Sequence, residues 1–156
     1  DLKGARVAIL GAGGAARACL SVLADTGADA TIFARNTEAA RALHSTRKFD
    51  VAEFQKGNDL ASFDVIVNGT PLGMRGEFEH FSPVPEAEFR AGQIVFDLVT
   101  KATDTPLLAA ARKAGANVIP GVEMLISQGL KQFEIWTGEK GDEQLVRKSI
   151  AEKMRL

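Results

Sequence analysis

The stretch AILGAGGAARACLSVL, residues 8–23, decides the fold of this 156-residue chain. Apolar residues lead directly into a glycine-rich turn, and an alanine-rich segment with helical spacing follows at once. The turn matches G-x-G-x-x-A, in which Gly11 permits a tight turn, Gly13 lets a pyrophosphate approach the backbone and Ala16 lets the helix pack close to the strand. The start of a helix also offers free N–H groups to an anion. We therefore expect a dinucleotide-binding turn rather than a glycine-rich corner without a ligand.

Short apolar segments alternate with helical patterns along the chain, which is typical of parallel strands joined by crossover helices. The predicted strands are 6–10, 30–34, one around Phe49, 63–70, 93–99 and 117–120. The predicted helices are 14–26, one capped by Asn36 or Thr37, one capped by Thr105 and ended by Gly115, 122–137, and 142–154. The sequence thus predicts a single α/β domain over 1–156, with a Rossmann-like doubly wound parallel sheet of about six strands and helices on both faces.

Composition excludes several classes of protein. A net charge of −1 gives no electrostatic reason to expect binding to nucleic acid or to an anionic membrane. No apolar segment is long enough to span a membrane. The single cysteine, Cys19, cannot form a disulfide within the chain, so we expect a reducing, cytoplasmic setting. The two histidines, His44 and His80, lie far apart and far from the cysteine, and this spacing predicts no metal site.

The end of the second predicted strand indicates which dinucleotide binds. An NAD site usually has Asp or Glu there, about 20 residues after the glycines, to bind the ribose 2′-hydroxyl. Here the strand ends in FARNT (33–37), and Arg35 stands in place of a carboxylate with Asn36 beside it. A guanidinium suits the 2′-phosphate of NADP through paired, charge-assisted hydrogen bonds. We expect NADP as the cofactor; the alternative is a solvent-exposed arginine that binds no ligand.

Five motifs, which include the glycine turn and the Arg35 segment, occur in order along the chain: GAGGAARA (11–18), ARNTEAARAL (34–43), DVIVNGTPLGM (64–74), VFDLVTKATDTPLL (95–108) and GVEMLISQGLKQFEIWTG (121–138). Together they resemble the C-terminal, NADP-binding domain of shikimate dehydrogenases over nearly the whole chain. The resemblance implies an oxidoreductase that uses NADPH to reduce 3-dehydroshikimate to shikimate in aromatic amino-acid biosynthesis, or a close relative that acts on quinate.

The resemblance also assigns roles to individual residues. It implies a pyrophosphate site at Gly11, Ala12, Gly13, Gly14 and Ala15. It gives the 2′-phosphate to Arg35 with Asn36, places Thr70, Leu98 and Gly121 near the cofactor, and gives Gln128 a hydroxyl of the shikimate ring. The family usually has tyrosine in a D-x-x-Y-x-P pattern after the fifth strand. This chain has Thr100 there and contains no tyrosine, so a substrate contact through Thr100 would use a much shorter arm.

In the family, the catalytic lysine and aspartate belong to a separate N-terminal substrate domain, so we expect no catalytic residue in this chain. The helices at 122–137 and 142–154 should border that domain, and their apolar residues should cause weak self-association of the isolated chain. Asp97 follows a strand, where it could either act in the active site or cap a turn. The alternatives are the NADP domain of another two-domain enzyme, such as methylenetetrahydrofolate dehydrogenase or glutamyl-tRNA reductase, and a non-catalytic module that senses a nucleotide or metabolite.

Overall fold

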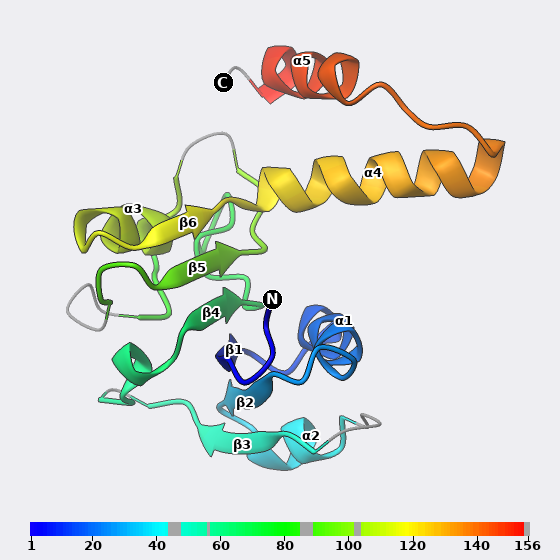
Figure 1. Ribbon diagram of the computed structural model, residues 1–156. Helices are drawn as coiled ribbons and strands as arrows, with labels where there is room; N and C mark the ends of the chain where they lie inside the picture. The colour runs from blue at the N-terminus through cyan, green and yellow to red at the C-terminus, as the bar shows by residue number, and fades with distance from the viewer. Residues whose placement is uncertain (44–47, 56, 85–88, 102–103, 155–156) are drawn as a thin grey trace.

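The computed structural model describes residues 1–43, 48–55, 57–84, 89–101 and 104–154. Its strands are β1 (Arg6–Leu10), β2 (Asp29–Ala34), β3 (Asp50–Glu53), β4 (Val65–Asn68), β5 (Ile94–Asp97) and β6 (Asn117–Ile119). Its helices are α1 (Gly14–Leu23), α2 (Thr37–Arg41), α3 (Pro106–Lys113), α4 (Gly121–Thr137), α5 (Glu143–Met154) and the short 3₁₀ helix η1 (Leu60–Ser62). The strands form one parallel sheet in the order β3-β2-β1-β4-β5-β6, which confirms the predicted doubly wound fold (Figure 1).

Strand β1 lies inside the sheet and is covered on both faces. Along it, Val7 and Ile9 belong to the apolar cluster beneath α1 and α2, whereas Ala8 and Leu10 belong to the cluster on the opposite face. All four side chains are at most 1% exposed. A strand buried on both faces has no polar side to present to water, so its sequence is a continuous apolar run. The predicted helices on both faces are confirmed.

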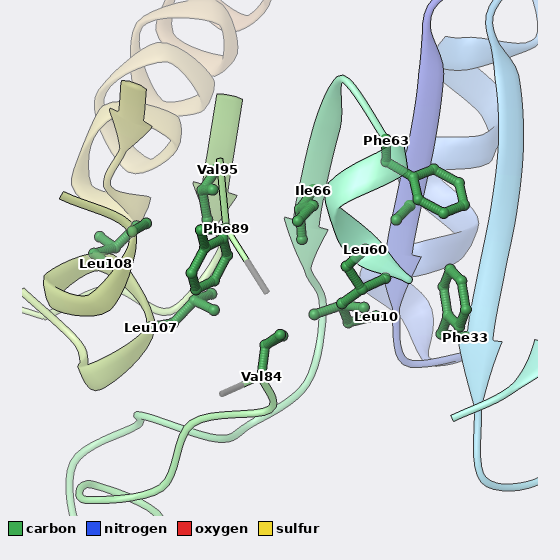
Figure 2. Close-up of a cluster of buried hydrophobic side chains, with 12 residues drawn as sticks. Leu10, Phe33, Leu60, Phe63, Ile66, Val84, Phe89, Val95, Leu107 and Leu108 are labelled. Carbon is green, nitrogen blue, oxygen red and sulfur yellow. The ribbon is translucent and has the colours of Figure 1, made fainter. Parts of the chain in front are cut away.

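The cluster on the α3 face joins distant parts of the chain (Figure 2). Leu107 and Leu108 of α3 are almost fully buried and lie toward β5 and β4. At the other side of the cluster, the rings of Phe33 and Phe63 meet edge-on with centroids 5.6 Å apart. This face therefore holds α3 and the η1 segment on one continuous core.

Helix α1 ends at Leu23, three residues before the predicted end at Thr26. The Thr26 hydroxyl donates to the carbonyl oxygen of Leu23 at 2.8 Å and accepts from the Ala28 N–H at 3.3 Å. A threonine that bonds the nearby backbone in this way offers an alternative to the helical hydrogen bonds. Gly27, in the left-handed region at φ +77°, closes the turn that follows.

Two predicted caps are confirmed. The Asn36 side chain accepts from the Ala39 N–H and begins α2. The Thr105 side chain accepts from the Leu108 N–H, with proline in the first turn of α3. Each cap pairs one N–H group that the helix itself cannot satisfy.

The two closing helices leave much of their apolar surface in water. Helix α4 extends away from the sheet, and α5 lies beside α4 (Figure 1). None of the described residues of α5 is buried. Phe133 is 44% exposed and Trp136 79% exposed. The guanidinium of Arg147 on α5 donates two hydrogen bonds to the Glu123 carboxylate on α4, at 2.9 and 2.7 Å. No helix in the described part of the chain is long and apolar enough to cross a membrane.

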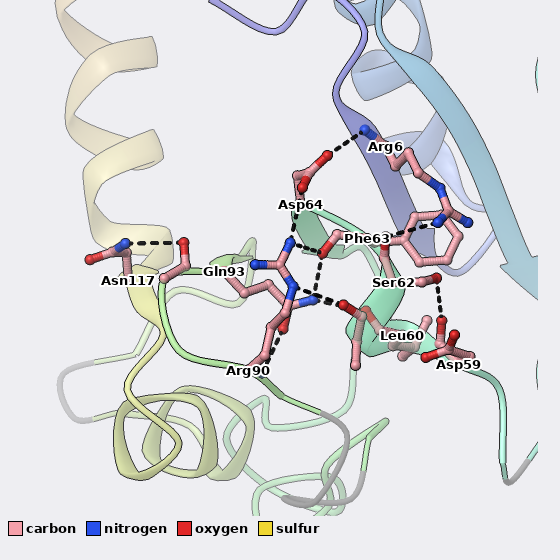
Figure 3. Close-up of polar contacts among 11 residues, drawn as sticks. Arg6, Asp59, Leu60, Ser62, Phe63, Asp64, Arg90, Gln93 and Asn117 are labelled. Carbon is pink, nitrogen blue, oxygen red and sulfur yellow. Dashed lines mark hydrogen bonds and ion pairs between the residues drawn. The ribbon is translucent and has the colours of Figure 1, made fainter.

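The amino edge of the sheet, where β4 and β5 begin, is closed by a polar cluster (Figure 3). The buried Gln93 side chain donates to the carbonyl oxygens of Leu60 and Phe63, each at 2.8 Å. Arg90 donates to the same Phe63 carbonyl and forms an ion pair with Asp64 at 2.9 Å. These bonds hold η1 against the start of β5.

Candidate functional site

The predicted site residues gather at the opposite, carboxyl edge of the sheet. The glycine turn follows β1, Arg35 and Asn36 follow β2, Thr70 follows β4, Leu98 and Thr100 follow β5, and Gly121 follows β6. Strand β1 lies between β2 and β4, so the crossovers leave it in opposite directions along the sheet. In open parallel sheets, ligands bind outside the carboxyl ends of the strands at this reversal of strand order.

Gly11 is required at its position for two reasons. Its φ of +98° lies in the left-handed region that glycine adopts without strain. A Cβ at this position would lie 3.1 Å from Thr70 Cγ2 and 3.2 Å from the carbonyl oxygen of Gly69. The Gly11 N–H donates to the Phe33 carbonyl oxygen at 2.8 Å, which fixes the turn between the ends of β1 and β2. The turn therefore lies so close to the end of β4 that a side chain at this position would be crowded.

The next residues of the turn are open to a ligand. A Cβ built at Gly13 or Gly14 would meet nothing within 4 Å, and both residues are exposed. Gly13 is the N-cap of α1, has no side chain to bind the free N–H groups, and is followed by a first turn without an acidic residue. Free N–H groups and the helix dipole favour an anion at such a terminus. The residues present fit a pyrophosphate, with Ala12 and Ala15 beside the glycines.

Arg35 and Asn36 form the corner between β2 and α2. Both are exposed, and Asn36 uses its side-chain oxygen to cap α2 through the Ala39 N–H at 3.0 Å. The cap fixes the direction in which the chain leaves β2. Within the described part of the chain, Arg35 forms no ion pair, so its guanidinium is available to an anion at this edge.

A buried polar network connects the ends of β4 and β5. The Asp97 carboxylate accepts hydrogen bonds from the Asn68 amide at 2.9 Å, from the Val99 N–H at 3.0 Å and from the Thr105 hydroxyl. The Asn68 side-chain oxygen in turn accepts from the Thr70 hydroxyl at 2.6 Å. We call Asn68, Thr70, Asp97 and Thr105 the carboxyl-edge network.

The structure resolves the two roles that the sequence left open for Asp97. Burial raises the pKa of its carboxyl group, and the hydrogen bonds from Thr105, Val99 and Asn68 oppose that rise. The residue is 0% exposed and both carboxylate oxygens are hydrogen-bonded within the protein. Asp97 therefore caps the turn after β5 and has no exposed atom to present to a ligand. The sequence did not lead us to Asn68. It could have been found as the one polar residue at the end of the otherwise apolar strand β4.

Gly121 brings α4 against the end of β5. A Cβ here would lie 2.5 Å from the carbonyl oxygen of Val99 and 2.9 Å from that of Asp97. Real Cβ atoms do not approach backbone so closely, so α4 can begin here only from glycine. Leu98 packs partly against the cluster beneath α1, which also includes Ala12. Gly121 is therefore needed for packing, whatever it contributes to a cofactor.

The remaining candidates are placed as follows. Thr100 is exposed, and Gln128 is exposed about two turns into α4. The next residue after Thr100, Lys101, forms an ion pair with Glu79 at 3.0 Å, and this pair lowers the pKa of the Glu79 carboxyl. His80 is exposed in the same loop as Glu79, and His44 lies outside the described residues. The described residues contain no group of three or more metal-ligating side chains.

Comparisons with known proteins agree with this geometry. A family model described as the Shikimate 5'-dehydrogenase C-terminal domain matches residues 121–150. The shikimate dehydrogenase (NADP(+)) of Archaeoglobus fulgidus is 38% identical over 161 residues, which covers 100% of this chain and 60% of that protein. A crystal structure of a shikimate dehydrogenase in complex with NADP+ has a TM-score of 0.89 at 33% identity, covering 97% of this chain and 55% of that chain. Over its whole length, the chain corresponds to the C-terminal, NADP-binding part of shikimate dehydrogenases.

A protein named for another substrate has a similar fold. The quinate dehydrogenase from Corynebacterium glutamicum, solved in complex with NAD, has a TM-score of 0.82 at 26% identity, covering 97% of this chain and 56% of that chain. The chain spans about three fifths of the length of the Archaeoglobus relative. The match includes the glycine turn and the strand ends of this chain, since it covers all of its residues.

Proposed function

We propose that the chain is the NADP-binding domain of an enzyme that reduces 3-dehydroshikimate to shikimate. The observation that carries the proposal is the uncapped start of α1 together with Arg35 at the end of β2. The first feature suits a pyrophosphate and the second a 2′-phosphate. The shikimate dehydrogenase (NADP(+)) of Archaeoglobus fulgidus, similar over the whole chain, supports the choice of reaction.

In this proposal, each part of the edge has a separate task. The N–H groups of the turn from Gly11 to Ala15 bind the pyrophosphate, and Arg35 binds the 2′-phosphate with Asn36 beside it. Thr70, Leu98 and Gly121 form the surface on which the nicotinamide half lies. Bound NADPH supplies the hydride for reduction of the carbonyl.

The substrate half of the site is incomplete in this chain. Gln128 presents an amide donor and acceptor suited to a hydroxyl of the ring, and Thr100 presents a short hydroxyl arm. Asp97 is unavailable as an acid because it is fully buried and hydrogen-bonded. The proton that accompanies hydride transfer must then come from elsewhere in the protein. We assign it to an N-terminal substrate domain, in keeping with the length of the relatives that this chain leaves unmatched.

The exposed apolar side chains of α4 and α5 support the same division into domains. Phe133, Ile135 and Trp136 on α4 and Leu145 on α5 are each at least 44% exposed. Large exposed apolar surfaces usually mark sites where another protein or domain packs. We assign this surface to the border with the N-terminal domain, and we expect weak self-association through it in the isolated chain. The single free thiol, Cys19, is compatible with a cytoplasmic setting.

A titration of the chain with NADPH and NADH tests the cofactor assignment. Arg35→Ala removes a charged hydrogen bond of about 1.5–3 kcal/mol, so NADPH affinity should fall about tenfold or more. NADH affinity should change little. Arg112→Ala is the matched control, because it removes the same charge from α3 and should affect neither cofactor. Equal losses for both cofactors in Arg35→Ala would show that Arg35 shapes the fold and does not bind the 2′-phosphate.

A second candidate, oxidation of quinate with NAD, is supported by the similarity to the quinate dehydrogenase and by Thr100 in place of tyrosine. Activity assays of the full-length gene product with shikimate and quinate, each with NADP and NAD, separate the two. The isolated chain should bind NADPH but should not reduce 3-dehydroshikimate, because binding without a placed acid leaves the transition state unsupported. Turnover by the chain at an ordinary enzymatic rate would contradict the proposed division. A full-length protein that binds NADPH and turns over neither acid would instead support a sensing module.

A further inference from the structure

The hydrogen bonds of the carboxyl-edge network have a fixed direction. Thr105 accepts from the Leu108 N–H and so directs its own proton to Asp97. The Asn68 amide nitrogen donates to the same carboxylate. Three donors converge on Asp97, counting the Val99 N–H, and none of these groups can reverse its role without losing a partner. No described buried side-chain polar atom lacks a hydrogen bond.

The fixed direction continues from Asn68 to the glycine turn. Because its amide nitrogen faces Asp97, the Asn68 side-chain oxygen faces Thr70 and accepts from both its N–H and its hydroxyl, at 3.0 and 2.6 Å. The Thr70 oxygen also accepts from the Leu72 N–H at 3.3 Å. The hydroxyl proton of Thr70 is thus used within the protein. The methyl group of Thr70 therefore packs against Gly11. A Cβ added at Gly11 would lie 3.1 Å from this methyl carbon.

We propose that Asp97 is a positioning residue that sets the shape of the dinucleotide-binding turn through Asn68 and Thr70. The same carboxylate fixes the Val99 backbone, which lies against the start of α4 at Gly121. One buried group therefore places both surfaces on which the two halves of a dinucleotide would lie. The inference rests on the proposed function, because its effect is expressed as dinucleotide affinity. Buried networks in which every member is satisfied hold a single geometry, and removal of the central acceptor frees all of its donors.

The test compares two buried polar residues of the β5 segment. Asp97→Leu removes the acceptor of the network, whereas Gln93→Leu removes a buried amide at the amino edge, which has no connection to the turn. NADPH affinity is measured by calorimetry at a temperature where both variants are folded. We expect Asp97→Leu to weaken binding at least about tenfold and Gln93→Leu to leave it within about twofold. The backbone amide signals of Gly11 and Gly13 in NMR spectra should move in the first variant only.

Gentler variants keep the test decisive if Asp97→Leu does not fold. Thr105→Val keeps the side-chain shape but removes one donor to Asp97 and the acceptor that caps α3, so it should lower stability, move the Gly11 and Gly13 amide signals and weaken binding about threefold or more. Thr105→Ser, which restores the hydroxyl, should recover all three. The proposal is overturned if folded Asp97 or Thr105 variants bind NADPH as the wild type does, or if Gln93→Leu loses as much affinity. Absence of binding by the wild type would instead reject the proposed function.

Discussion

Gln93 and Asp97, at the two ends of one strand, show how differently a buried polar group can be used. Both are 0% exposed, and both are fully hydrogen-bonded. Gln93 is mainly a donor: its amide nitrogen binds two carbonyl oxygens of the η1 segment, and its oxygen accepts from the Arg90 N–H. These partners form the closed amino edge of the sheet.

Asp97 is an acceptor only, and its partners come from separate loops at the open edge. A residue that accepts from the ends of β4, β5 and α3 fixes those loops relative to one another while leaving their outer surfaces free. The comparison indicates that the amino edge contributes to stability alone, whereas the carboxyl edge also fixes the geometry of the ligand-binding loops. Substitutions at the amino edge should therefore change only the free energy of unfolding, whereas substitutions at the carboxyl edge should change ligand affinity as well.

The largest expected effect is that of Gly121→Ala at the carboxyl edge. The new Cβ would lie 2.5 Å from the Val99 carbonyl oxygen, so the start of α4 must move. Overpacking of this kind lowers the free energy of unfolding by roughly 3 kcal/mol, and it should also weaken NADPH binding. Urea denaturation measures the first effect and titration the second.

Gly129→Ala in the same helix is the matched control for that variant. A Cβ at Gly129 would meet nothing within 4 Å, and the residue is exposed. Alanine at such a position should raise the free energy of unfolding by about 0.5–1 kcal/mol. If both variants behaved alike, the close approach of α4 to β5 would have no energetic role.

Gln93→Leu should have the next largest effect, and on stability alone. It removes two hydrogen bonds to carbonyl oxygens and one to an N–H, each contributing about 1 kcal/mol, and part of this loss is offset by burial of an apolar side chain. We expect the free energy of unfolding to fall by about 2 kcal/mol in thermal or urea denaturation. Gln132→Ala, at an exposed glutamine of α4, should change it by less than about 0.5 kcal/mol. A Gln93 variant as stable as the wild type would remove the distinction between the two edges.

The same comparison explains what could be predicted from the sequence. The six strands and their order of appearance follow from apolar periodicity, which is a local property. The glycine turn and Arg35 were also found because each motif is contiguous with its own strand. Helix α1 was predicted too long because the competing hydrogen bond from the Thr26 hydroxyl to Leu23 depends on the turn that follows.

Roles that depend on residues far apart in the sequence could not be predicted. Asp97 is bound by Asn68, 29 residues away, and by Thr105, 8 residues away. Its role was open because nothing next to it in the sequence distinguishes a buried cap from an active-site acid. Gly121 was assigned to the cofactor by resemblance, but its requirement for packing follows from the Val99 carbonyl oxygen, which only the folded chain brings near.

The smallest expected effect concerns α5, whose described residues pack on α4 and on neither the amino nor the carboxyl edge of the sheet. Its Arg147 holds the pKa of the Glu123 carboxyl below the ordinary glutamate value through two hydrogen bonds. A carboxyl group whose pKa is lowered on folding stabilises the folded state above its unfolded pKa, about 4.3, and this contribution is lost as the pH falls through the lowered value. Both side chains are at least 40% exposed, so the attachment is weak and sensitive to salt.

Backbone ¹⁵N relaxation measures this attachment directly. On acidification from neutral pH to below the lowered pKa of Glu123, the amides of α5 should become more mobile, while those of β1 and β4 remain rigid. Glu123→Gln should show the mobile α5 already at neutral pH, because the amide cannot attract the guanidinium as a charge does. Glu143→Gln should keep the neutral-pH attachment, since Glu143 binds Arg147 within α5 and does not join the two helices. If α5 stayed rigid in Glu123→Gln, packing of α5 on α4 rather than the ion pair would hold it, and the exposed apolar side chains of the two helices would be the groups to vary next.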